Sequence, residues 1–131
     1  MTRVNLSRRE FEEKLIETFP KLYKDMYGDI RKTCMAFGIE CGPGWFDLIW
    51  ELSEKMEPLL VGDDETTCVA QVKEKYGGLR FYMSHYYNKT IGELEYEYEE
   101  KSYKICESCG KEGTPSKNGW IKTLCKEHKK E

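Results

Sequence analysis

Four side chains that bind borderline metal ions occur as two pairs in the last quarter of the chain. Cys106 and Cys109 are three positions apart, and after fifteen further residues Cys125 and His128 follow at the same spacing. Such a pair places two ligand atoms on one tight turn, and two pairs form a tetrahedral zinc site. Three thiolates and one imidazole disfavour hard cations. The sequence therefore predicts zinc as the cofactor, held by a C-terminal zinc-ribbon-like pair of knuckles.

Four protein ligands would fill the coordination shell of this ion. A catalytic zinc keeps one position for water, whereas a structural zinc does not. The predicted role is therefore structural, and the ion would order residues 105–131, which we call the C-terminal module. We expect this module to pack onto a first domain, made of helices and a β-hairpin, over residues 1–104.

Length and composition allow that first domain a real core. The chain has 131 residues, of which 39% are hydrophobic and 13% aromatic, so aromatic side chains can supply much of the buried area. The net charge is −3 and no basic run occurs, which disfavours non-specific binding to duplex nucleic acid. No apolar stretch approaches the roughly 20 residues that span a bilayer. Without the form of a signal peptide at its start, the chain is expected to be cytoplasmic, with no membrane partner.

Three cysteines remain outside the two pairs: Cys34, Cys41 and Cys68. Six cysteines in a secreted chain would suggest disulfides, but the metal-type spacing favours a reducing compartment. We predict free thiols that pack as small hydrophobic residues. A Cys34–Cys41 disulfide and a reactive thiol are the alternatives.

Two helices are clearly indicated in the N-terminal half. Ser7 and Glu10 form a capping box, and apolar residues at helical spacing follow it, so a helix is expected over 8–18. The second helix is expected over 45–56, where apolar residues trace one stripe. Between them, Asp29 is predicted to begin a short helix through Phe37.

Two loops and a hairpin are indicated by glycine, proline and β-rich runs. Glycines and a proline predict a tight loop over 39–44, and a second loop is predicted over 61–65. The β-rich runs 68–76 and 79–83 flank Gly77-Gly78, which predicts a hairpin with both glycines in its turn. One hairpin face is apolar, and the other carries these four side chains: Lys73, Lys75, Arg80 and Tyr82.

The acidic stretch 91–100 fits either a helix or a strand. Ile91, Leu94 and Tyr98 recur at helical spacing, whereas Leu94, Tyr96 and Tyr98 alternate as in a strand. A strand would line up four glutamates on one face, where like charges are unfavourable. We therefore predict a helix over about 90–103, preceded by a turn at Asn88. The expected fold class is α+β, with N-terminal helices packed on a β-hairpin.

The polar face of the hairpin is the first candidate for a ligand-binding surface. Cations with an interleaved tyrosine suit a phosphate, a nucleotide or an acidic partner. The backbone N–H groups of Gly42-Pro43-Gly44 could also face an anion. The alternatives are a solvated strand face, pairing with the acidic stretch, and an ordinary loop. The predicted ligand-binding residues are Lys73, Lys75, Arg80, Tyr82 and Trp45.

A second candidate surface lies in the C-terminal module. Residues 106–131 contain six Lys and four Glu, and Trp120 could stack on a nucleobase or form a hydrophobic lid over the metal site. The first functional hypothesis is a non-enzymatic module that binds an anionic small molecule or a host protein. The alternative is a zinc-dependent nucleic-acid-binding regulator. One histidine outside the metal set and no nucleophile motif give no catalytic residues.

Three motifs in order carry a resemblance to a known family. They are GPGWFDLI over 42–49, QVKEKYGGLRFY over 71–82, and CxxCG with GWxxTLCxxH over 106–128. Together they resemble a family of small, largely uncharacterised proteins of bacteriophages and bacterial prophage regions. The resemblance implies an accessory protein acting in the bacterial cytoplasm, similar in setting to phage proteins that counter host defence. It implies no particular reaction and leaves a homo-oligomer open.

Overall fold

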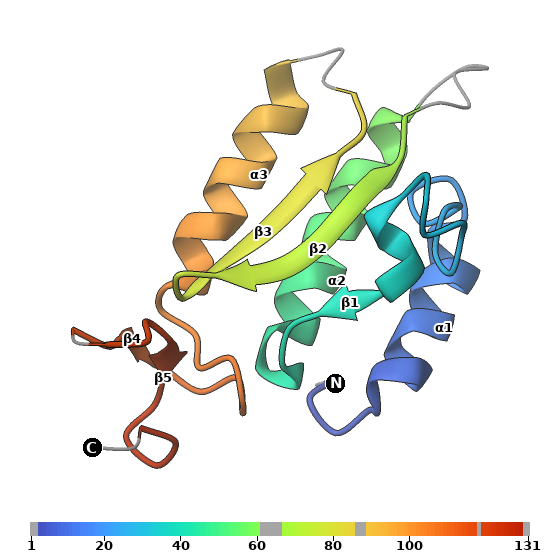
Figure 1. Ribbon diagram of the computed structural model, residues 1–131. Helices are drawn as coiled ribbons and strands as arrows, with labels where there is room; N and C mark the ends of the chain where they lie inside the picture. The colour runs from blue at the N-terminus through green and yellow to red at the C-terminus, as the bar shows by residue number, and fades with distance from the viewer. Residues whose placement is uncertain (1–2, 61–66, 86–88, 118, 130–131) are drawn as a thin grey trace.

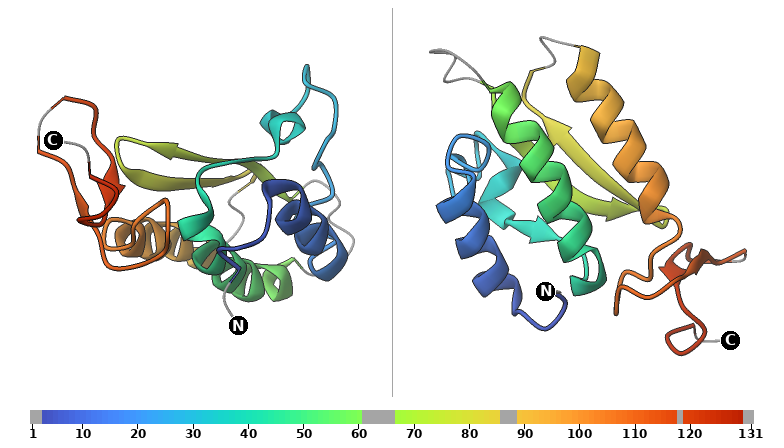
Figure 2. Two further views of the ribbon diagram at one scale, coloured as in Figure 1. Left: turned by 90° about the horizontal axis from the view of Figure 1, so that it is seen from below. Right: turned by 180° about the vertical axis from the view of Figure 1, so that it is seen from behind.

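The protein is an α+β molecule in which three helices cover one face of a small sheet (Figures 1 and 2). The computed structural model describes residues 3–60, 67–85, 89–117 and 119–129. The predicted loop at 61–65 and the turn at Asn88 lie outside these residues. The α+β class is confirmed. The sheet has the order β1-β2-β3, with strands β1 (Ile39–Glu40), β2 (Val69–Lys75) and β3 (Gly78–Met83).

The first helix, α1 (Arg8–Thr18), begins at the predicted capping box. The Ser7 hydroxyl accepts the Glu10 N–H at 3.1 Å, and the Glu10 carboxylate accepts the Ser7 N–H at 2.9 Å. These two bonds satisfy N–H groups that have no partner inside the helix. The buried face of α1 includes Phe11, whose ring stacks on Phe46 at a centroid distance of 4.1 Å.

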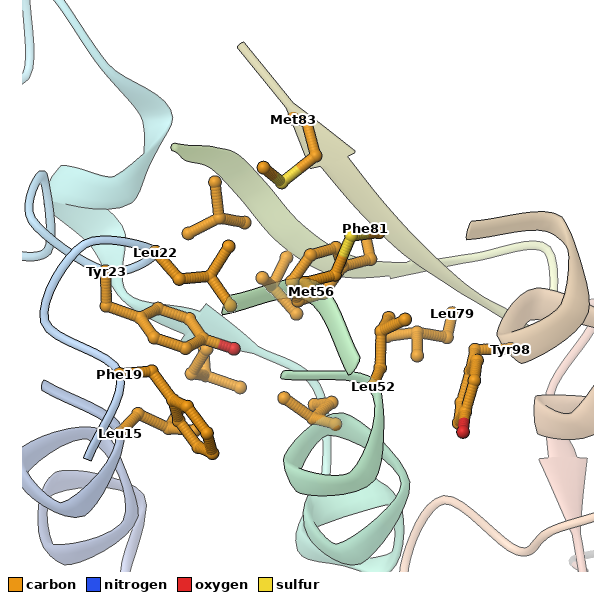
Figure 3. Close-up of a cluster of buried hydrophobic side chains, with 14 of the residues drawn as sticks. Leu15, Phe19, Leu22, Tyr23, Leu52, Met56, Leu79, Phe81, Met83 and Tyr98 are labelled. Atoms are coloured by element: carbon orange, nitrogen blue, oxygen red, sulfur yellow. The ribbon is translucent and has the colours of Figure 1, made fainter. Parts of the chain in front are cut away.

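The second helix, α2 (Phe46–Met56), lies between α1 and α3 (Lys89–Ser102) on the covered side of the sheet (Figure 2). Its predicted apolar stripe is buried, so both the helix and its orientation are confirmed. A buried hydrogen bond of 2.6 Å joins the hydroxyls of Ser53 and Tyr23. Side chains from the helices and the sheet meet in one core (Figure 3), which includes these residues: Leu15, Phe19, Leu22, Tyr23, Leu52, Met56, Leu79, Phe81, Met83 and Tyr98.

The predicted helix from Asp29 is wrong in its first half. The Asp29 carboxylate accepts the Arg31 N–H, and the Thr33 hydroxyl accepts the Met35 N–H. These local bonds compete with helix formation, and only a 3₁₀ turn over Cys34–Phe37 follows. The predicted loop at 39–44 is also partly wrong, because its first two residues form β1, parallel to β2.

A buried carboxylate fixes the position of β1. Glu12 on α1 is only 3% exposed, and it accepts the Ile39 N–H at 2.7 Å and the Tyr27 hydroxyl at 2.6 Å. The Arg8 guanidinium lies 3.7 Å from the same carboxylate. A buried charge requires such partners, so α1 and the start of the sheet are joined by a polar contact as well as by the apolar core.

The predicted hairpin is confirmed, but its turn lies one residue earlier than predicted. Tyr76 and Gly77 have positive φ values of 53° and 83°, as a two-residue type I′ turn requires. Gly78 already belongs to β3 and pairs with Lys75. A Cβ atom at Gly78 would lie 2.5–2.8 Å from Tyr103, so this glycine allows α3 and its C-terminal end to approach the strand.

The acidic stretch forms the helix α3, so the strand alternative is wrong. Part of its negative charge is neutralised within the helix, because the Lys101 ammonium lies 3.1 Å from the Glu97 carboxylate. Ser102 at its end accepts the Leu79 N–H at 2.9 Å and thereby covers the outer edge of β3. None of the helices in the described part of the chain is long and apolar enough to cross a membrane.

Candidate functional site

The four predicted metal ligands come together at one point in the C-terminal module. The sulfur atoms of Cys106, Cys109 and Cys125 and a ring nitrogen of His128 all lie within 4.8 Å of one another. The Sγ atoms of Cys109 and Cys125 are 3.7 Å apart. His128 Nδ1 lies 3.7 Å from the Cys106 sulfur and 3.1 Å from the Cys125 sulfur. The quartet could therefore hold a metal ion.

The two distances of 3.7 Å match the edges of a small metal tetrahedron, whereas the 3.1 Å between His128 Nδ1 and the Cys125 sulfur is shorter than such an edge. Metal–sulfur bonds of about 2.3 Å and metal–nitrogen bonds of about 2.0 Å give edges of about 3.8 Å between sulfurs and about 3.6 Å between sulfur and nitrogen. Two of the three thiols are also favoured in their ionised form. Burial opposes ionisation of Cys125, but hydrogen bonds from His128, Cys109 and Cys106 together outweigh it and lower the pKa of Cys125 to about 6. Burial of Cys106 is likewise outweighed by hydrogen bonds that lower its pKa, whereas at Cys109 a backbone hydrogen bond from Lys111 is outweighed by burial and by Cys106 and Cys125, so that its pKa is raised. A thiolate is the form that binds metal.

Two tight turns position the ligands. The Cys106 carbonyl accepts the Gly110 N–H at 2.9 Å, and Gly110 has a φ of 83°, which favours glycine. The Cys125 carbonyl accepts the His128 N–H at 3.1 Å. The strand β5 (Thr123–Leu124), paired with β4 (Thr114–Pro115), leads directly into Cys125.

The Gly42-Pro43-Gly44 turn does bind an anion, but that anion belongs to the protein. The Glu107 carboxylate accepts the Gly42 N–H at 2.8 Å, and the Glu107 carbonyl accepts the Gly44 N–H at 2.7 Å. Glu107 lies between the first two ligands and is 8% exposed. The turn therefore connects the C-terminal module to the start of α2 and is not a free anion site.

A lysine connects the same module to the hairpin. The Lys122 ammonium lies 2.8 Å from the Glu74 carboxylate and 3.6 Å from the Glu107 carboxylate. The Thr123 hydroxyl donates to the Gly77 carbonyl at 2.6 Å. Paired and partly buried charges hold their partners more firmly than exposed ones. The metal turns, the Gly42–Gly44 turn and the hairpin tip thus form one connected structure.

The inclusion of Trp45 in the predicted ligand surface is wrong. Its side chain is fully buried, and its indole N–H donates to the Ile105 carbonyl at 2.8 Å. An indole N–H that is buried needs such a partner. Trp45 therefore anchors the beginning of the C-terminal module and presents no surface to a ligand.

The other four predicted ligand residues lie on the face of the sheet that no helix covers (Figure 2, left). Arg80 is already engaged, because its guanidinium lies 2.9 Å from the Glu99 carboxylate on α3 and its side chain is only 20% exposed. This contact is the pairing with the acidic stretch that the sequence left open as an alternative to ligand binding. Lys75 and Tyr82 are exposed, whereas Lys73 is half-buried and lies opposite Arg80 on one side and Glu40 on the other.

Trp120 is 82% exposed, so the expectation that it forms a lid over the metal site is wrong. It lines a groove of about 360 Å³ between the hairpin tip and the 119–121 segment, together with Tyr76, Ile121 and Lys75. Tyr76 is 66% exposed, and the Lys75 ammonium lies 5.6 Å from the centre of its ring. Two aromatic side chains from distant parts of the sequence therefore line one groove.

The three cysteines outside the metal quartet are free thiols, so the disulfide alternative is wrong. Cys68 is buried as predicted, and burial together with a hydrogen bond to Asp25 raises its pKa to about 11. Burial also raises the pKa of Cys41. Cys34 is exposed, contrary to the packing role predicted for it.

Sequence reasoning missed the residues that connect the site to the rest of the protein. The contacts of Glu107 and Lys122 could not be predicted, because their partners lie 65 and 48 positions away in the chain. The one available signal was an acid between two thiolate ligands, where a negative charge is costly without a partner. The position of Tyr76 beside Trp120 could not be predicted either, since it depends on the tertiary fold.

Comparison of the chain with protein-family models, with curated proteins and with solved structures gave no match. A function is therefore inferred from the geometry of the chain's own residues.

Proposed function

We propose that this protein is a non-enzymatic binding module that takes an anionic ligand on the uncovered face of its sheet. The observation that carries the proposal is the one-sided coverage of the sheet, with Lys73 and Lys75 on the open face. Within the described residues these two lysines form no ion pair, so their charge is available to a ligand. Tyr82, at 41% exposure, adds an aromatic surface beside them.

The proposed role of the metal site is to hold this surface in place. Three sulfurs and one nitrogen at tetrahedral distances suit zinc best among common metal ions. Cys106, Cys109, Cys125 and His128 would hold it, and four protein ligands support a structural role. The contacts of Glu107 and Lys122 would transmit that order to the hairpin tip.

The proposed ligand classes are a nucleotide-type signal or an acidic surface of a host protein. Both present carboxylate or phosphate oxygens that lysine side chains bind. The resemblance to bacteriophage and prophage proteins supports a setting in the bacterial cytoplasm, and a role against host defence is part of the proposal. His85, the one histidine outside the metal quartet, is exposed and lies 3.3 Å from the Ser84 hydroxyl.

Nucleotide binding is expected to stabilise the protein through Lys73 and Lys75. Adenine and guanine nucleotides, linear and cyclic, are the probes, each followed by thermal unfolding of the zinc-loaded chain. At about 100 times its Kd, a bound nucleotide adds about 2.7 kcal/mol, which raises Tm by several degrees. The Lys73→Ala/Lys75→Ala double variant is expected to lose this rise.

Lys14→Ala is the matched control, because Lys14 is an exposed lysine on α1, on the covered side of the sheet. It removes one positive charge without touching the open face and is expected to keep the full rise in Tm. Equal rises in the wild type and the double variant would contradict binding at this face. Arg80→Ala is less suitable, because it also breaks the contact with Glu99.

A further inference from the structure

The groove between the hairpin tip and the 119–121 segment is lined by large aromatic and apolar side chains that are exposed to solvent. Its two aromatic lining residues, Trp120 and Tyr76, are 82% and 66% exposed. Leaving an indole in water forgoes about 2 kcal/mol or more of burial free energy. Ile121, 39% exposed, adds an apolar wall to the same groove.

The groove is built by contacts on both sides. The methyl group of Ile121 and the Thr123 hydroxyl would each lie 3.2 Å from a Cβ at Gly77, so the module packs closely against the turn. The bond between Lys122 and Glu74 fixes the two walls relative to each other. The two backbone segments that carry Tyr76 and Trp120 are therefore held together by the fold.

The groove presents a lysine beside its aromatic side chains. Glu74 is the one carboxylate among the lining residues, and it is engaged at 2.8 Å by Lys122, which also lies 3.6 Å from Glu107. Lys75 then remains in the groove, and Lys73 follows two residues away on the same strand face, at about 7 Å along the strand. Lys117, three positions before Trp120 in the sequence, is also exposed. A ligand that suits this arrangement carries a flat apolar group and more than one negative charge in a row.

We propose that this groove binds an unpaired base of a single-stranded nucleic acid, whose phosphates lie along Lys75 and Lys73. The base packs against both Trp120 and Tyr76, and stacking on aromatic side chains is how proteins hold single strands without sequence preference. A duplex hides the faces of its bases, and so it is excluded from the aromatic groove. This inference rests on the proposed function and names the class of its ligand.

Fluorescence anisotropy with a fluorescein-labelled twelve-nucleotide oligothymidylate tests the proposal on the zinc-loaded full chain. Trp120→Ala and Tyr76→Ala are each expected to raise Kd at least about fivefold, from the loss of one stacked base. Trp120→Phe is expected to restore most of the affinity. Two phosphate contacts predict that Kd rises about sevenfold between 50 and 200 mM salt, and the Lys73→Ala/Lys75→Ala variant loses most of this dependence.

Tyr96→Ala is the matched control, because Tyr96 is also a tyrosine at 66% exposure but lies on the acidic helix α3. The proposal is overturned if Trp120→Ala and Tyr76→Ala bind the oligonucleotide as tightly as Tyr96→Ala. It is also overturned if a blunt duplex of the same length, or thymidine monophosphate, binds as tightly as the single strand. If nucleotides still stabilise the protein through Lys73 and Lys75 in those cases, the proposed function survives without this inference. If the lysine double variant changes nothing, the proposed function fails as well.

Discussion

Removal of the metal is expected to unfold the C-terminal module and to loosen the hairpin tip, while α1 and α2 stay folded. The module has two strands of two residues each and little apolar core of its own. Structural zinc sites contribute apparent free energies on the order of 10 kcal/mol, far more than these short strands can supply. Without the metal, Glu107 and Lys122 lose the turns that hold them near their partners.

Hydrogen exchange before and after chelation measures this effect. The N–H groups of Gly42 and Gly44 donate to Glu107, outside the metal turns themselves, and they are expected to lose protection together with Glu107 and Gly113. The Phe19 N–H, which donates to Leu15 at 2.8 Å in α1, is the internal control and stays protected. A module that keeps its protection after complete removal of the metal would contradict a structural role.

Gly44→Ala is expected to be the most damaging single methyl group that can be added to the Gly42–Gly44 turn. A Cβ there would overlap the Cys106 carbonyl oxygen and would lie 2.6 Å from the carbonyl group of Glu107. Both neighbours are backbone atoms of the first metal turn, so the clash cannot be relieved by moving a flexible side chain. Overpacking of this kind costs about 3 kcal/mol or more, and it separates α2 from the C-terminal module.

Gly92→Ala is the matched control for this substitution. Gly92 lies in α3, and a Cβ there would have nothing within 4 Å, so the change is expected to stabilise the helix by about 0.5–1 kcal/mol. Urea unfolding of both zinc-loaded variants and the wild type measures the two changes in the free energy of unfolding, which are expected to have opposite signs. A Gly44→Ala protein as stable as the wild type would show that α2 and the metal turns are not in close contact.

Local patterns in the sequence were sufficient for the elements whose signals are local. The capping box of Ser7 and Glu10 marks the start of α1, and the apolar stripe after Trp45 marks α2. The spacing of the metal ligands predicted a quartet that the fold does bring together. In each case the residues that decide the structure lie within a few turns or a single motif.

Contacts between distant residues account for most of what was predicted wrongly, the helix expected from Asp29 being the exception, because local hydrogen bonds prevent it. The two-residue strand β1 forms because Glu12 and β2 supply its partners, and neither is visible from 39–44 alone. The buried Trp45 indole donates its hydrogen bond to the Ile105 carbonyl, 60 positions away. The hairpin turn lies one residue earlier than predicted. Gly78 lies in β3, where a Cβ would clash with Tyr103, and Tyr76 takes a turn position with positive φ.

Native mass spectrometry of protein purified from bacterial cells tests the central claim most directly, namely that a zinc-held module presents Lys73 and Lys75 to an anionic ligand. The account predicts one zinc ion per chain, with a phosphate-containing molecule retained by part of the wild-type protein. The Lys73→Ala/Lys75→Ala variant is expected to keep the zinc ion and to lose that molecule. Wild-type protein without zinc, or a double variant that retains the same molecule to the same extent, would contradict the account.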